Sequence, residues 1–329
     1  MRQLTIFFFL YTLLFSVTSL ADEQKRVALV GTNANLKMAH RIEGALLAES
    51  NPRPMVTRID PLNNDQLKIL DSTSYDLVIT LGPDSAERAL NRCVSSPILG
   101  LLLPHHLYYR LKKNHPLSHF TALFIDQPIG RQLDLIQSIM LPSEQNTSIG
   151  IILGPDSSRI KNIAQEEAYE RNLSLKMVHI HQDENPISGL GVLIDNTSYL
   201  LALADDHVYN PYTARGILLA TFRKKVPLIS HTYTYVRKGA LAAVYSSPQQ
   251  IADDATQFIM TILNNEDDKL PLPRYPKQFS VAVNYQAAQS LDRTLESEHD
   301  ILKKLIYLEE QNKKKEHCKL INHQDLINN

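Results

Sequence analysis

Short apolar runs alternate with segments of helical spacing along most of this 329-residue chain. KRVALVG, DLVITLG, ILGLLLP and HFTALFID are rich in leucine and β-branched residues, as buried strands are. A second series opens with SIGIILG and continues through LSLKMVHI, GVLID, YLLALAD, VPLIS and ALAAVYS. Helical spacing covers about residues 34–50, SRIKNIAQEEAYERN and PYTARGILLATFRKK. Strands separated by single helices predict βαβ units, so the two series predict an α/β protein with two doubly wound, Rossmann-like lobes.

The first 21 residues have the pattern of a secretory signal. A basic residue precedes an apolar run from Leu4 to about Val17, and the small residues Ser19 and Ala21 precede a charged stretch. This pattern predicts a signal peptide over residues 1–21, cleaved after Ala21, and a periplasmic mature chain. The alternative is an uncleaved anchor, but the run is shorter than the roughly 20 residues that a bilayer requires.

Composition argues against several classes of protein. The 34 basic and 35 acidic residues nearly balance, so we expect no nucleic-acid partner. Cys93 and Cys318 are too few for a disulfide framework or a CxxC-type zinc site, and we expect them to be unpaired. We also expect neither a cofactor nor a metal, and a monomer.

Motifs of catalysis are missing from the sequence. It contains no GxxxxGK[ST], GxGxxG, GxSxG or HExxH. The doublet His105-His106 is explained by a loop at a strand end, where its two rings diverge. The chain is therefore predicted not to be an enzyme.

Loops that follow the strands are the expected place for a ligand, because doubly wound sheets bind ligands beyond the carboxyl ends of their strands. The tetrapeptide GPDS occurs in two of these loops, at residues 82–85 and 154–157. Glycine permits a sharp exit from the strand, and Asp or Ser is expected to cap the following helix. The alternative is a binding element that occurs twice, since a helix N-terminus suits a carboxylate.

Asp205, Asp206 and His207 form a polar cluster between two apolar runs, and His231 ends the next predicted strand. A carboxylate and an imidazole there could activate water or hold a metal. They could equally bind a solute, or Asp205 could cap the helix that begins near Pro211. Ligand binding and capping are favoured over catalysis, because no nucleophile or second ligand pair accompanies the cluster.

Beyond Asp292 the sequence is dense in charge, with leucine and isoleucine at helical intervals. It predicts an amphipathic helix followed by a frayed tail. Packing on the second lobe is the expected role, and docking to a partner is the alternative.

Three segments resemble a known family. DDHVYNPYTARGILLATFRKKVPLIS, GALAAVYSSPQQIADDA and LPLPRYPKQFSVAVNYQAAQSL resemble ABC transporter substrate-binding proteins of the uncharacterised and tryptophan-tyrosine-type systems. The resemblance implies a type I periplasmic binding protein fold, with two lobes joined by a three-crossover hinge. The first lobe would comprise residues 22–126 and 247–278, the second 127–246 and 279–298, and a charged C-terminal helix or tail would cover 299–329. The stretch LLLPHHLYYRLKKNHPLSHF departs from the family by being bulky and basic.

The resemblance also implies a function. A small, possibly amino acid-like, solute would be held between the lobes and delivered to an ABC permease. The alternative is a sensory binding protein that signals to a membrane-bound partner without transport. The expected ligand-binding residues are Thr32, Asn33, Gly82, Pro83 and Asp84 of the first lobe, Asp126 at the hinge, and Asp205, Asn210 and Tyr233 of the second lobe.

Overall fold

The computed structural model describes residues 24–92, 95–144, 147–265 and 269–327, with side chains up to Asn312. The predicted signal peptide, Cys93 and the side chain of Cys318 lie outside the described residues. Within the described part, no helix has the length and apolar character needed to span a membrane.

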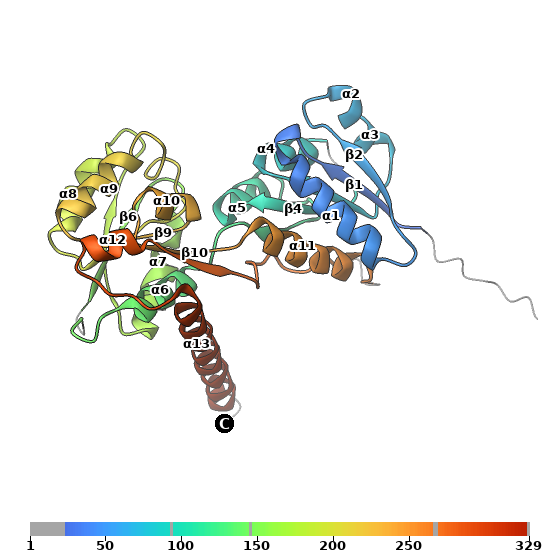
Figure 1. Cartoon of the computed structure of the whole chain (residues 1–329). Helices are drawn as coiled ribbons and strands as arrows, with labels where there is room; N and C mark the ends of the chain where they lie inside the picture. Colours follow the sequence, from blue (N-terminus) through green and yellow to red (C-terminus); the bar gives the residue numbers. More distant parts are fainter. Residues whose placement is uncertain (1–23, 93–94, 145–146, 266–268, 328–329) are drawn as a thin grey trace, which may run out of the picture.

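Two helix-covered sheets form two lobes (Figure 1). The first sheet has the strand order β2-β1-β3-β4-β5, and its pairs are parallel. The first lobe consists of β1 (Arg26–Val30), η1 (Asn33–Asn35), α1 (Leu36–Glu49), β2 (Met55–Ile59), α2 (Asn64–Leu67), α3 (Ile69–Ser72), β3 (Leu77–Leu81), α4 (Pro83–Leu90), β4 (Ile98–Leu103), α5 (His105–Asn114), β5 (Phe120–Phe124) and α11 (Pro248–Leu263).

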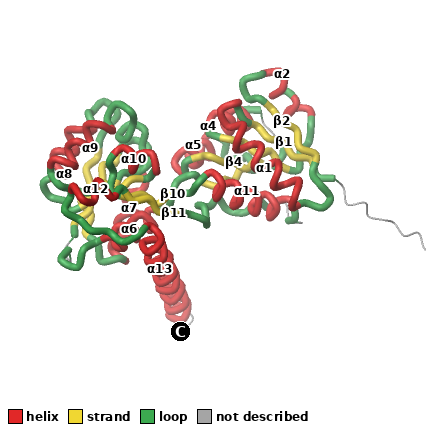
Figure 2. The backbone as a smooth tube through the Cα atoms, viewed as in Figure 1, coloured by secondary structure: helices red, strands yellow, loops and turns green. Residues whose placement is uncertain are grey.

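The second sheet has the order β11-β10-β9-β8-β6-β7, in which the β10–β11 pair is antiparallel (Figure 2). The strands of this lobe are drawn in yellow, among red helices. The predicted α/β class with two doubly wound lobes is confirmed. The second lobe consists of α6 (Ile129–Ile139), β6 (Ser148–Leu153), η2 (Ser158–Ile160), α7 (Lys161–Glu170), β7 (Ser174–His179), α8 (Pro186–Ile194), β8 (Tyr199–Leu201), α9 (Ala214–Arg223), β9 (Leu228–Ser230), α10 (Tyr233–Lys238), β10 (Ala242–Tyr245), β11 (Ser280–Val283), α12 (Tyr285–Ser290) and α13 (Glu298–Ile327).

Two elements differ from the sequence-based prediction. GVLID was predicted to be a strand but lies at the end of α8, whose buried residues recur at helical spacing and whose start is capped by the side chain of Asn185. A segment of five residues is too short to distinguish a buried strand from a buried helix turn. Strand β2 was not predicted; it lies at a sheet edge and buries only Ile59 completely, so its sequence lacks a continuous apolar run.

The chain passes between the lobes three times, through residues 125–128, 246–247 and 270–279. The third crossover runs beside β5, where Phe124 N donates to Arg274 O at 2.9 Å and Arg274 N donates to Ala122 O at 2.9 Å. It then enters the second sheet as β11, which pairs with β10. Helix α11 returns to the first lobe, where its buried face shares a core with α1. Each lobe is therefore assembled from segments that are distant in the sequence.

Helix α13 begins in the second lobe and extends away from both lobes (Figure 1). Ile301 and Leu305 are 1% and 0% exposed and belong to the hydrophobic core of that lobe. The helix is continuous to Ile327, whereas the sequence predicted an amphipathic helix followed by a frayed tail. The first turns of α13 thus complete the core of the second lobe.

We expect Leu305→Ala to lower the free energy of unfolding by about 2–5 kcal/mol, because truncating a buried leucine leaves a cavity. Ile306→Ala is the matched control, since Ile306 is 42% exposed, and it should cost less than about 1 kcal/mol. Urea denaturation of both variants measures the difference. Equal losses would show that α13 does not pack on the lobe in solution.

Candidate functional site

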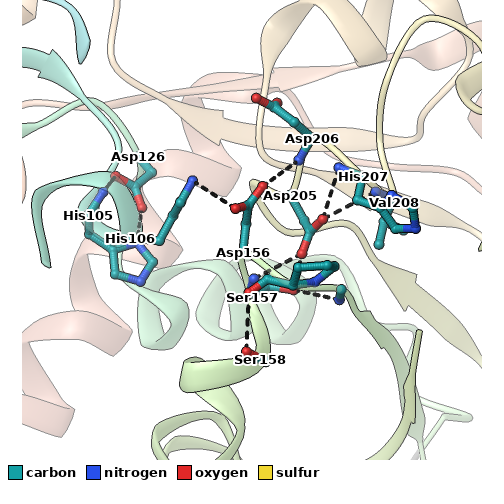
Figure 3. Close-up of polar contacts among 12 residues, drawn as sticks. His105, His106, Asp126, Asp156, Ser157, Ser158, Asp205, Asp206, His207 and Val208 are labelled. Atoms are coloured by element: carbon teal, nitrogen blue, oxygen red, sulfur yellow. Dashed lines mark hydrogen bonds and ion pairs between the residues drawn. The ribbon is translucent and has the colours of Figure 1, made fainter. Parts of the chain in front are cut away.

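The loops at the carboxyl ends of the strands bring polar side chains from both lobes together (Figure 3). His106 follows β4 in the first lobe, and Asp156 follows β6 in the second. His106 Nε2 lies 3.8 Å from Asp156 Oδ1, so an imidazole and a carboxylate meet between the lobes. This separation exceeds a hydrogen bond and is an electrostatic contact. These two side chains mark where the lobes face each other.

His106 is held as a neutral imidazole. Its side chain is 10% exposed, and among the described residues its Nδ1 has no hydrogen-bond partner. Burial lowers the pKa of His106, and the Asp156 carboxylate opposes this effect only in part. A second N–H on the charged ring would be buried without an acceptor, which is costly.

Asp126, a predicted ligand residue, is engaged by the neighbouring helix. One of its carboxylate oxygens accepts from His105 N at 2.9 Å, and the other contacts His105 Nδ1. The His105 ring lies against Phe124 and Tyr275, with ring centroids 6.2 and 6.0 Å away. Asp126 therefore joins the first crossover to the start of α5.

Both carboxylate oxygens of Asp205 accept hydrogen bonds from the protein's own backbone and side chains. Its residue is 1% exposed, and Oδ2 accepts from both Ser157 N (2.9 Å) and Ser157 Oγ (2.7 Å). Oδ1 accepts from His207 N and Val208 N at 3.1 and 3.2 Å. These bonds tie the loop after β6 to the loop after β8 and explain Asp205 without a ligand. Its predicted role as a ligand contact remains a prediction.

Asn210 has a similar structural role. Its side-chain oxygen accepts from Tyr212 N and Thr213 N, while its Nδ2 donates to Asp206 O and His207 O. Tyr233, the predicted aromatic wall, is 48% exposed and stacks on Tyr245 with ring centroids 5.4 Å apart. Tyr245 ends β10, so this ring pair lies beside the second crossover.

In the first lobe, the predicted residues follow β1 and β3. Thr32 and Asn33 line a cavity of about 250 Å³ next to β2. Gly82 has a φ of 89°, which favours glycine, and precedes Pro83 at the first position of α4. Asp84 is exposed in the first turn of that helix and makes no capping hydrogen bond.

The expected capping role of GPDS is wrong for both copies. Gly82 is the N-cap of α4, and it has no side chain to cap with. In the second copy, Ser157 is the N-cap residue of η2, but its side chain makes no capping hydrogen bond: its hydroxyl accepts from Gly154 N at 3.0 Å and donates to Asp205. The tetrapeptide therefore shapes the two loops in different ways.

Three rings of the second lobe carry buried polar atoms without partners among the described residues. These atoms are the hydroxyl groups of Tyr209 and Tyr235 and Nδ1 of His231. The ring centroids lie 5.9–6.4 Å apart. Burial lowers the pKa of His231, against nearby carboxylates that include Asp126 and Asp206. Burial also raises the pKa of Tyr235 to about 12, so the phenol stays a neutral donor.

Sequence reasoning did not single out several of these groups. His106 was explained as part of a loop, yet it lies in the first turn of α5 and reaches the other lobe. Asp156 was considered only within the GPDS segment, as a cap or a binding element, and Tyr209 and Tyr235 were not singled out. Their position directly after strands was the available signal, but burial without a partner is visible only in the structure. No group of three or more metal-ligating side chains occurs in the described ranges.

Gly154→Ala tests the contact between the two loops. An added Cβ would lie 2.6 Å from both Asp205 carboxylate oxygens and 2.6 Å from Val208 Cγ2. We expect a loss of about 1–3 kcal/mol in the free energy of unfolding, as for overpacked sites. Gly191→Ala in α8 is the control: nothing lies within 4 Å of its added Cβ, so it should stabilise by about 0.5–1 kcal/mol. Both variants are compared by thermal unfolding. If Gly154→Ala left the stability unchanged, the contact between the two loops would be rejected.

Comparison with known families identifies the class of protein. The family described as ABC transporter substrate binding protein matches residues 63–304, well over half of the chain. The chain therefore belongs to this family of substrate-binding proteins, which confirms the resemblance and the prediction of a non-enzymatic protein. A comparison with curated proteins gives no match.

Solved structures agree on the fold. A conserved domain protein from Vibrio cholerae O1 biovar eltor is 17% identical, with a TM-score of 0.56 over 86% of this chain and 98% of that one. A Streptococcus pneumoniae ABC domain in complex with L-Trp is 16% identical, with a TM-score of 0.55 over 85% and 98%. The ligand-free, open CD0873 of Clostridium difficile, a substrate binding protein with adhesive properties, is 15% identical, with a TM-score of 0.63 over 83% and 96%. The fold is that of a type I periplasmic binding protein.

Proposed function

We propose that this protein is exported through a cleaved signal peptide, captures a small solute between its two lobes and delivers it to an ABC permease. The observation that carries the proposal is the approach of His106 and Asp156 from opposite lobes, where the buried Nδ1 of His106 lacks a partner in the described residues. A buried polar group is costly when unpaired, so a solute with matching donors and acceptors would be favoured there.

Hinge bending supplies the mechanism. The three crossovers allow the lobes to approach, and a solute that contacts both lobes binds the closed form better than the open one. Its binding energy therefore shifts the population toward closure. A permease that recognises the closed form would then receive loaded protein selectively.

The charges around the site favour a solute with a cationic group. Asp126 and Asp206 lie close enough to His231 to act on its charge, and His106 faces a carboxylate across the lobes. An ammonium group near Asp126, Asp156 or Asp206 and a flat body near Tyr209 and Tyr235 fit these surroundings. An amino acid-like solute combines both parts, as in the L-Trp complex of the similar pneumococcal structure. Thr32, Asn33, Gly82, Pro83 and Asp84 are proposed to contact it from the first lobe.

A sensory role is the second candidate, in which the closed state is reported to a membrane-bound partner. Helix α13 favours this alternative, because it is anchored in the second lobe and extends beyond it. The two roles share the same solute site and differ in the partner that recognises closure.

A thermal-shift screen of the mature protein against amino acids, amines, nucleobases, sugars and anions tests the proposal. A solute at a hundredfold excess over its dissociation constant adds about 2.7 kcal/mol of stability, which raises the melting temperature by several degrees. We expect a cationic or zwitterionic solute to give this shift. A folded protein that no compound stabilises would contradict solute capture.

Asp156→Asn, tested with the same solute, should weaken binding at least about tenfold if its carboxylate serves the cationic group. Asp195→Asn is the control, since Asp195 lies at the end of α8 and its carboxylate is 58% exposed. If calorimetry gave equal affinities for the two variants, Asp156 would not be a ligand-binding residue.

A further inference from the structure

A continuous chain of hydrogen bonds links all three crossovers. Gln127, in the first crossover, donates through Nε2 to Ser246 Oγ of the second at 2.9 Å. Ser246 Oγ donates to Gln278 O, in the third crossover, at 2.6 Å. The side chains of Gln127 and Ser246 therefore join the three crossovers by hydrogen bonds. These are the segments that must move when the lobes close.

The chain of bonds continues from the hinge to α13. Arg131 Nη1 donates to Gln127 Oε1 at 2.6 Å and to Pro276 O at 2.9 Å. The same guanidinium donates from Nε and Nη2 to the two carboxylate oxygens of Glu309 on α13, both at 2.9 Å. One side chain thus connects the first crossover, the third crossover and the C-terminal helix.

The orientation of the Arg131 guanidinium depends on the groups around it. Its side chain is 6% exposed, and its guanidinium carbon lies 3.9 Å from the centre of the Phe279 ring. A bidentate carboxylate sets the orientation of a planar guanidinium. Removing the Glu309 charge would leave a buried cation with fewer partners and free it to reorient.

Packing alone does not make this link. A groove of about 580 Å³ lies between the hinge and α13, lined by Pro128, Tyr275, Phe279 and Ile306 among others. Where α13 passes the third crossover, the Arg131–Glu309 pair bridges this groove. Farther along, Asn312 Nδ2 donates to Asp134 Oδ1 at 3.0 Å, which fastens α13 to α6 without touching a crossover.

We propose that Arg131 and Glu309 are positioning residues of the hinge, through which α13 sets the balance between open and closed lobes and hence the affinity for the solute. The solute contacts neither residue. The proposal rests on solute capture by hinge bending, but it concerns the opposite side of the hinge. It assigns to α13 an effect on affinity in addition to its packing on the second lobe.

The distance between the lobes tests this directly and needs no solute. Lys37 and Asp183 are exposed residues near the carboxyl edges of the first and second sheets. Lys37→Cys and Asp183→Cys carry spin labels in the mature protein, after Cys93→Ser and Cys318→Ser remove the native thiols. Pulsed electron paramagnetic resonance then gives the distribution of label distances.

Glu309→Gln is expected to shift or broaden this distribution relative to the labelled parent, and Glu309→Asp is expected to restore it in part. Glu296→Gln is the matched control, because it removes an exposed ion pair of Lys304 on the same helix that contacts no crossover. An unchanged distribution in Glu309→Gln would overturn the proposal.

Asn312→Ala separates hinge coupling from simple anchoring. It loosens α13 from α6, so it should lower thermal stability while leaving the distance distribution as in the parent. If Asn312→Ala and Glu309→Gln change the distribution equally, α13 acts only as packing and the proposal is wrong.

With a solute from the screen, Glu309→Gln should change affinity about fivefold or more. If Glu309→Gln altered the distance distribution but no solute bound to the protein, the coupling of α13 to the hinge would stand. Solute capture would then be rejected instead.

Discussion

The buried guanidinium of Arg131 holds together the part of the molecule on which its function depends. The chain reaches the second lobe, returns and crosses again, so three separate segments must keep a common register at the hinge. Arg131 bonds to the first and third of these segments, and Gln127 extends the bonds to the second. The polar connection needs little chain length and can rearrange by side-chain rotation.

Carboxylates near the lobe interface fall into two groups. Asp205 is saturated by four hydrogen bonds, and Gly154 is needed because that carboxylate lies so close to the backbone. Asp156 instead faces His106 of the other lobe, with 23% of its side chain exposed. Burial and satisfied hydrogen bonding mark the first group as structural, whereas the second group remains able to meet a solute. This distinction assigns Asp205 to the framework that shapes the site.

The fold was predictable from the sequence to a large extent, because parallel strands buried on both faces leave apolar runs such as DLVITLG and SIGIILG. Edge strand β2 was not predicted because it has no such apolar run. Part of helix α8 was predicted as a strand because its apolar run is too short to classify. The site was less predictable. Position after a strand predicted the loops in which these side chains lie, but it could not show that Asp205 would hydrogen-bond with Ser157, or that His106 would reach Asp156. Those outcomes depend on tertiary contacts between residues 48 to 50 positions apart in the sequence, and on which side chain is left unpaired.

Closure of the two lobes around a solute can be measured by small-angle X-ray scattering. The mature protein would be measured alone and with a saturating concentration of the solute that stabilises it most. We expect a smaller radius of gyration in the presence of the solute, because closure brings the lobes together. A solute that binds tightly while the radius of gyration stays the same would contradict capture by hinge closure.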